Sequence, residues 1–196
     1  GKGRGRRKNG LRNRKPITYK TAPKGDYVLE KRELPEPLQN GAIRLLQEAF
    51  EEDENVRVVM STLDDNNRGR PSNEGTTKTR EWWVTKLRDL GGNLDSYKKK
   101  GGIFVGINPM TALGSKDEHV TKYRHVLVEF DHIPSLEEQW NLINEAKLPC
   151  TAVISSGNKS LHAWVKVDAK DLAEYEQRRK LLFDHLADHV DPNNAN

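Results

Sequence analysis

The sequence predicts a mixed α/β (α+β) fold, and three observations lead to this prediction. Short β-like runs alternate with amphipathic helical segments along the chain. The second half reads strand, helix, strand, strand, helix, and a Gly-Asn turn joins its two consecutive strands. The 196 residues suffice for a real core, and the 34% of apolar residues gather into periodic segments.

The N-terminal end is the most basic part of the chain. Residues 1–15 hold eight Lys or Arg and no acid, so that 25 basic and 29 acidic residues remain elsewhere, a net charge of −4. Such a run is typical of a solvated disordered arm, but it can also add salt-sensitive affinity for phosphate backbones. We expect a disordered arm over residues 1–20, and both interpretations of its role stay open.

An N-terminal α/β portion is predicted over residues 21–119. Helical spacing of apolar residues, short β-branched runs and the Gly91-Gly92 stop place its elements. The predicted elements are a helix over 35–52, a strand over 56–60, a helix over 82–90 and a strand over 103–107. Residues 63–75, rich in Asp, Asn, Gly and Pro, are predicted to form a loop.

The C-terminal portion, residues 120–196, has the clearer pattern. Ser135 with Glu138 forms a capping box at the start of a helix, and Gly157 lies in the turn of a predicted antiparallel hairpin. The predicted elements are a strand over 123–131, a helix from 135 to 148, strands over 151–155 and 160–167, and a helix over 170–189. This order resembles most of a β-α-β-β-α-β unit.

Two carboxylates, Glu129 and Asp131, lie at the carboxyl end of the first strand of this unit. Because side chains alternate along a strand, both leave the same face while Phe130 points to the other. Neighbouring carboxylates repel unless a cation or hydrogen bonds compensate, and Mg²⁺ held by carboxylates and substrate phosphates meets this need. A solvated strand end is the alternative.

Ser160 and His162 repeat this spacing on the second hairpin strand, and Trp164 and Lys166 continue the same face, which we expect to be polar. A hydroxyl, an imidazole and the amides of the neighbouring turn can bind phosphate oxygens. The alternative is an exposed strand face with a structural histidine. The strand order can place this pair beside the acid pair, and Asp191 can return a third carboxylate to the sheet.

The composition excludes several classes of protein. A single cysteine, Cys150, rules out an intramolecular disulfide and a cysteine-ligated zinc site. No apolar run approaches the roughly 18 residues that span a bilayer, and no apolar segment follows the N-terminal basic residues as in a signal peptide. We expect a soluble, cytoplasmic and nucleoid-associated protein with no membrane partner.

Three segments resemble the motifs of the archaeo-eukaryotic primase superfamily, which are a pair of acids, a Ser-x-His and a lone Asp. The matching residues are Val126-Leu-Val-Glu-Phe-Asp131, then Ser155-Ser-Gly-Asn-Lys-Ser-Leu-His-Ala-Trp164, then Asp191. The second motif is similar to that of the primase-polymerases of bacteria, phages, plasmids and CRISPR-associated systems. The segment 102–109 also resembles the one that precedes the first motif in that branch.

The resemblance implies a primase-like fold, with an N-terminal α/β portion packed on an RRM-like catalytic portion and the active site in the groove between them. It implies template-directed transfer of an NTP or dNTP to a 3′-hydroxyl on single-stranded DNA, with two Mg²⁺ or Mn²⁺ ions and no zinc. Family members continue beyond the third motif and work with a helicase or accessory priming domain, which would lie outside this chain.

The resemblance also implies a role for individual residues. The metal ligands and catalytic carboxylates would be Glu129, Asp131 and Asp191. The groups on the nucleotide phosphates would be Ser160 and His162, with Lys159 as a helper.

Two other functions use the same features. A non-catalytic RRM-like module would bind single-stranded nucleic acid through aromatic residues on an open sheet face, for which Trp164 is the one motif residue available. A metal-dependent nuclease would use the carboxylates and His162 to activate water. The acids favour an enzyme, because without a metal they would repel phosphate, but they leave the nuclease open.

Overall fold

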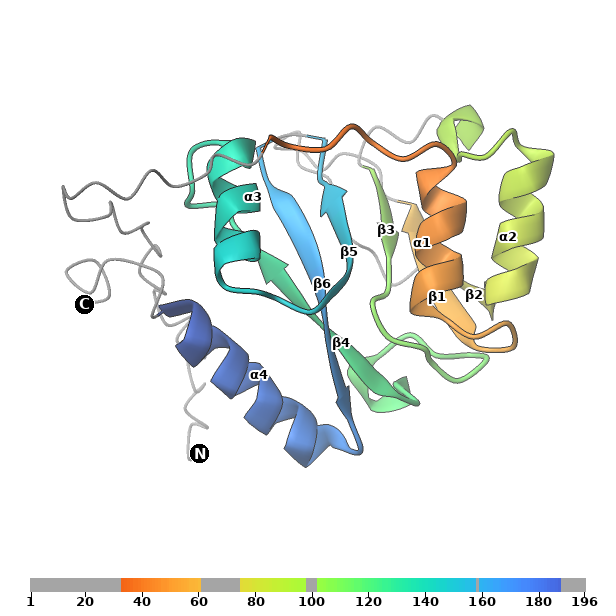
Figure 1. Cartoon of the computed structure of the whole chain (residues 1–196). Helices are drawn as coiled ribbons and strands as arrows, with labels where there is room; N and C mark the ends of the chain where they lie inside the picture. Colours follow the sequence, from red (N-terminus) through yellow and green to blue (C-terminus); the bar gives the residue numbers. More distant parts are fainter. Residues whose placement is uncertain (1–32, 61–74, 98–101, 158, 188–196) are drawn as a thin grey trace, which may run out of the picture.

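The computed structural model describes residues 33–60, 75–97, 102–157 and 159–187. These ranges contain four α-helices and two three-stranded sheets in which every strand pairing is antiparallel, so the fold is α+β (Figure 1). None of the helices in these ranges has both the length and the apolar character needed to cross a membrane. The basic arm, the predicted loop up to residue 74 and Asp191 lie outside the described residues.

The first sheet is formed by the N-terminal half, in the spatial order β2-β1-β3. Its elements are α1 (Gly41–Ala49), β1 (Asn55–Met60), β2 (Thr76–Thr79), α2 (Arg80–Asp89) and β3 (Ile103–Val105). Helix α1 is shorter than the predicted 35–52, because Asn40 adopts a left-handed conformation with φ 53° and Phe50 is already extended. Strand β2 was not predicted at all, since Thr-Thr-Lys-Thr carries no apolar alternation.

Helix α2 shows how local sequence sets its bounds. The hydroxyl of Thr79 accepts a hydrogen bond from the amide of Trp82 at 3.2 Å, which caps the first turn. At the other end Gly91 has φ 79°, a conformation that residues with side chains rarely adopt, and the Gly92 amide donates to the Leu87 carbonyl at 2.7 Å. The predicted stop at the two glycines is confirmed.

The second sheet is formed by the C-terminal half, in the order β4-β6-β5. Its elements are β4 (Tyr123–Glu129), α3 (Leu136–Glu145), β5 (Cys150–Ser155), β6 (Leu161–Ala169) and α4 (Leu172–Ala187). The predicted order of elements and the predicted hairpin are confirmed. The Ser135 hydroxyl caps α3 by accepting from the Glu138 amide, and the Ser156 amide closes the hairpin turn by donating to the Ser160 carbonyl at 3.0 Å.

Two apolar clusters cover the two faces of this second sheet. On one face α3 and α4 pack on alternate residues of β4 and β6, such as Val126 and Ala163. On the other face Trp164 of β6 is 3% exposed and joins the cluster formed by α1, α2 and β1, and α1 contacts β5. The rings of Trp164 and Phe50 meet edge to face at 6.2 Å. The prediction of a polar face at Trp164 is therefore wrong, because the N-terminal half packs against it.

An ion-pair cluster fastens the two halves to each other. Glu54, just before β1, accepts from both terminal nitrogens of Arg124 on β4 at 2.8 Å and pairs with Lys122 at 2.8 Å. Arg124 also donates to the Ala49 carbonyl at the end of α1. Burial alone would raise the pKa of Glu54, but the hydrogen bonds from Arg124 and Lys122 outweigh it and lower the pKa to about 2.

A second polar link joins the segment after β3 to β4. The Asn108 side chain accepts from the Arg124 and His125 amides at 2.8 Å and donates to the His125 carbonyl at 2.9 Å. His125 is fully buried, with Nδ1 3.2 Å from the Ile107 carbonyl and Nε2 2.7 Å from the Thr151 hydroxyl. Burial lowers the pKa of His125, so the neutral ring donates to the carbonyl and accepts from Thr151.

Candidate functional site

The acid pair and the Ser/His pair lie on neighbouring strands, as the strand order predicts. In the β4–β6 pairing Glu129 stands directly opposite His162, and their Oε1 and Nε2 atoms are 3.6 Å apart. Both side chains are partly exposed to solvent. The imidazole of His162 and the carboxylate of Glu129 therefore lie side by side at this end of the two strands.

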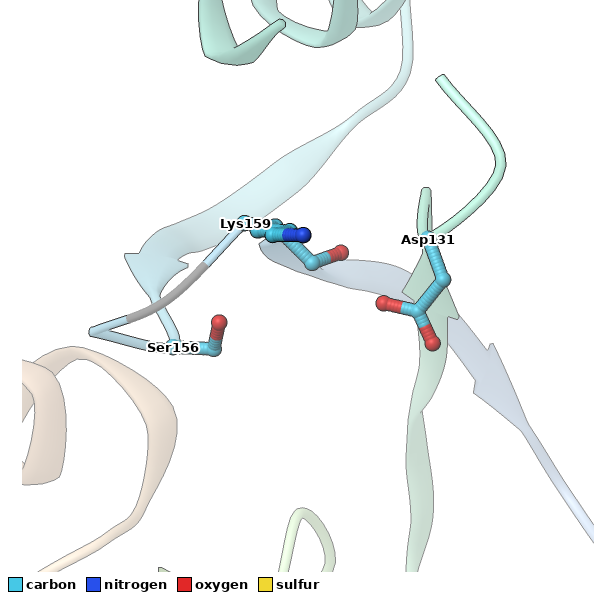
Figure 2. A pocket seen from close by; sticks show the side chains of 4 residues that line it. Asp131, Ser156 and Lys159 are labelled. Atoms are coloured by element: carbon cyan, nitrogen blue, oxygen red, sulfur yellow. The ribbon is translucent and has the colours of Figure 1, made fainter. Parts of the chain in front are cut away.

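Asp131 follows the end of β4 and lines a pocket of about 570 Å³. Phe130 is buried, while Glu129 before it and Asp131 after it are exposed, so the alternation predicted for this segment is seen. The other lining residues among those described are Ser156, Lys159 and Ser160, all from the β5–β6 turn. Figure 2 shows Asp131 on one side of the pocket, with Ser156 and Lys159 on the other.

The pocket differs in position from the expected groove between the two halves. Its lining residues among those described all belong to the C-terminal half. The reason is local, because the hairpin turn and the turn after β4 face each other at the same end of the sheet (Figure 2). The structure thus brings Asp131, Lys159 and Ser160 together around one pocket, with Glu129 and His162 at the adjoining strand ends, and it does not describe Asp191.

Ser160 is more deeply placed than a residue on an exposed strand face would be. It is 4% exposed, and its hydroxyl accepts from the Phe130 amide at 3.3 Å. That amide lies between the two carboxylates Glu129 and Asp131. The Ser160 hydroxyl therefore holds the acid-bearing segment against the start of β6 while it lines the pocket.

Gln139, which the sequence pattern did not single out, reaches the same region from α3. Its side chain is fully buried and bonds to the Ile133 and Lys159 carbonyls and to the Leu161 amide. A signal for it does exist, since Gln139 occupies the buried helical stripe that Leu142 and Ile143 continue. A polar residue on such a stripe is buried and needs hydrogen-bond partners.

The described residues supply part of a ligand set for a divalent metal. Mg²⁺ often takes one or two carboxylates and completes its shell with water and substrate phosphates, which Glu129 and Asp131 fit. Within the described ranges no group of three or more His, Cys, Asp or Glu side chains gathers closely enough to hold an ion. Burial raises the pKa of Cys150 to about 11, so its thiol stays neutral and is a poor metal ligand.

Comparison with protein-family models, with curated proteins and with solved structures finds no match to this chain. The chemistry of the site is therefore the basis for inferring function. The pocket combines an exposed carboxylate, an ammonium group and hydroxyls, beside a carboxylate and an imidazole. Such a set can hold a metal ion on one side and phosphate oxygens on the other.

Proposed function

We propose that this chain is the catalytic core of a DNA primase-polymerase of the archaeo-eukaryotic primase superfamily. The observation that carries the proposal is the β4–β6 register, which sets Glu129 opposite His162 and Asp131 across a pocket from Lys159 and Ser160. The acid pair and the Ser-x-His segment with its turn lysine, the two motifs among the described residues, thus lie together at one end of the sheet.

In this proposal each side chain acts on the incoming nucleotide or on its metals. Glu129 and Asp131 would hold one or two Mg²⁺ or Mn²⁺ ions, with Asp191 as the third carboxylate. When bound, such ions neutralise charge on the phosphates and favour the alkoxide form of the attacking 3′-hydroxyl. Lys159 and His162 would bind and orient the triphosphate, and Ser160 would line its site. No covalent bond to the protein is needed.

The proposed fold is the primase-like one. Its RRM-like portion would be β4-α3-β5-β6-α4, in which both helices cover one face of the β4-β6-β5 sheet. The N-terminal half would be the α/β portion that packs on the other face through Trp164. The partners would be a single-stranded DNA template, a primer and an NTP or dNTP, with a helicase or accessory priming domain outside this chain.

The two alternative functions are not equally compatible with the site. A stacking platform for single-stranded nucleic acid needs exposed aromatic rings on the sheet, and Trp164 is buried under α1. This disfavours the non-catalytic RRM-like module. A metal-dependent nuclease needs the same carboxylates and would use water instead of a 3′-hydroxyl, so the experiment must separate these two reactions.

The test is an extension assay with the full chain, a 5′-labelled primer on a single-stranded template, Mg²⁺ or Mn²⁺, and either NTPs or dNTPs. The proposal predicts stepwise lengthening that follows the template and is abolished in a Glu129→Ala, Asp131→Ala double variant. Metal-dependent shortening of the primer, equally abolished in that variant, would show a nuclease instead. DNA binding without lengthening or shortening of the primer would support the non-catalytic binding module.

A further inference from the structure

The carboxamide of Gln139 is fully buried near the pocket and forms three hydrogen bonds. Its Nε2 donates to the Ile133 carbonyl at 2.9 Å and to the Lys159 carbonyl at 2.8 Å. Its Oε1 accepts from the Leu161 amide at 2.7 Å. Both amide hydrogens and the carbonyl oxygen thus have partners on the backbone.

These partners belong to the two walls of the pocket. Ile133 lies two residues after Asp131, in the turn that carries this carboxylate. Lys159 and Leu161 flank Ser160 on the opposite wall. One planar group on α3 therefore spans both walls, and the bond from the Phe130 amide to the Ser160 hydroxyl forms a second link between the same two segments.

We propose that Gln139 is a positioning residue, which sets how far Asp131 stands from Lys159 and Ser160. The inference rests on the proposed function, because it assigns this spacing to the seating of a metal-bound triphosphate between the two walls. Gln139 itself is fully buried and does not line the pocket, so it acts through the backbone of the two turns. Carboxylate and ammonium groups placed even 1 Å too far apart bind such a substrate poorly.

The three hydrogen bonds require a side-chain carboxamide at position 139, because they use two donor hydrogens and one acceptor oxygen. A methionine fills a similar volume, but it removes the partner of the buried Leu161 amide and the donor to the Ile133 and Lys159 carbonyls. An ionised carboxylate could still accept from the Leu161 amide, but it would face two carbonyl oxygens without a donor. Gln139→Met is therefore the direct test, because it removes the three bonds and preserves the apolar packing of α3.

The matched control is Leu142→Ala on the same helix, which opens a cavity in the core without touching the carboxamide. Amide exchange followed by NMR compares the Leu161 amide with that of Ala163, further along β6. We expect Gln139→Met to speed exchange at Leu161 at least about tenfold relative to Ala163. Leu142→Ala should raise the two rates in proportion to its loss of global stability.

Primer extension gives the second readout, at a temperature where both variants are folded. Gln139→Met should raise the KM for nucleotide about tenfold and change kcat less than about threefold, whereas Leu142→Ala should leave KM unchanged. A Leu161 amide that stays protected in Gln139→Met overturns the inference, whether or not the wild type extends primers. Faster exchange of the Leu161 amide in Gln139→Met together with an unchanged KM for nucleotide overturns the inference as well. If the wild type does not extend primers while exchange at Leu161 is faster in Gln139→Met, the proposed function is refuted. The role assigned to the spacing between the two walls is then refuted with it.

Discussion

The side chains around the pocket differ in what they contribute as single residues. Glu129 and Asp131 are exposed and carry charge, so little packing depends on them. Ser160 and Gln139 are buried, and each satisfies backbone groups that would otherwise lose their partners. The exposed carboxylates thus supply charge for binding, whereas Ser160 and Gln139 fix the shape of the pocket through hydrogen bonds.

Alanine substitutions should separate these two roles. Ser160→Ala leaves the buried Phe130 amide without its acceptor and should lower the free energy of unfolding by about 1–2 kcal/mol. Glu129→Ala should change it by no more than about 1 kcal/mol, because the Glu129 side chain is exposed and its contact with His162 is screened by solvent. Urea denaturation measures both, and Ser156→Ala, an exposed serine in the same pocket, is the matched control. A larger loss for Glu129→Ala than for Ser160→Ala would contradict this division.

For single residues, the sequence predicts the direction of side chains that alternate along a strand. It does not predict contacts that form when distant segments pack together. The spacing of Glu129, Phe130 and Asp131 follows from strand geometry and is confirmed. Trp164 was placed on a polar face because nothing local shows that the N-terminal half covers it. Gln139 was missed because its partners are backbone groups 6 to 22 residues away.

At the scale of elements, α3 connects the chain's local signals to the site. Its first turn is capped by Ser135, and Gln139 on its buried side bonds to the turn after β4 and to the β5–β6 turn. A helix that begins one residue earlier or later would rotate Gln139 by about 100° and take the carboxamide away from its partners. The cap therefore affects the geometry of the pocket as well as the stability of the helix.

Removing this cap should have a measurable cost. Ser135→Ala removes the acceptor for the Glu138 amide and should lower the free energy of unfolding by about 1 kcal/mol. Thr79→Ala removes the equivalent bond of α2, to the Trp82 amide, and should cost a similar amount. Thermal or urea unfolding gives both values. If α3 positions the site, the nucleotide affinity falls in Ser135→Ala and is kept in Thr79→Ala, and equal affinities would contradict this.

Most elements could be predicted because their signals are local. The capping serine, the two glycines after α2 and the hairpin turn each act within a few residues of one another. Strand β2 has no such signal, and its place depends on pairing with β1 at register positions such as Arg57 and Thr77. The short length of α1 likewise follows from Asn40, whose left-handed backbone the apolar pattern does not reveal.

At the scale of the whole molecule, the two sheets are joined by one apolar contact, by an ion-pair cluster and by the hydrogen bonds of Asn108. Trp164 inserts into the N-terminal core, and Glu54 binds Arg124 and Lys122 at the opposite end of β4 from Glu129. The pocket and this ion-pair cluster thus occupy the two ends of the same strand. Loss of the cluster should weaken the attachment of the halves and leave the pocket's own hydrogen bonds in place.

The cluster should make stability depend on pH in a defined range. The pKa of Glu54 is lowered from 4.5 to about 2 in the folded protein, so its contribution is complete above about pH 4.5 and is lost as the pH falls toward 2. By linkage the shift corresponds to about 3 kcal/mol, which solvent screening at this partly exposed site reduces to about 1–2 kcal/mol.

Urea unfolding between pH 5 and pH 2.5 measures this contribution. The free energy of unfolding should fall more steeply in the wild type than in Glu54→Gln, by about 1–2 kcal/mol over the range. Glu176→Gln, an exposed carboxylate paired with Arg179, is the control and should behave as the wild type. Identical slopes in the wild type and Glu54→Gln would contradict the assigned role of the cluster.

The basic arm should act on nucleic acid and not on nucleotide. Deleting residues 1–15 removes eight positive charges and leaves a net charge of −4, so single-stranded DNA should bind more weakly and with a smaller salt dependence. Fluorescence anisotropy at several salt concentrations gives the slope. An unchanged slope would mean that the arm does not contact the phosphate backbone. The affinity for nucleoside triphosphate should be the same with and without the arm.

The proposed function requires that the pocket beside β4 binds a metal-bound nucleotide through Asp131. Calorimetric titration of a non-hydrolysable nucleoside triphosphate, with and without Mg²⁺ or Mn²⁺, tests it on the wild type and on Asp131→Ala. Asp53→Ala, an exposed carboxylate in the turn before β1, is the control. We expect binding that requires the metal, persists in Asp53→Ala and is at least about tenfold weaker in Asp131→Ala. Binding that is the same in the wild type and Asp131→Ala would contradict the proposed role of this carboxylate.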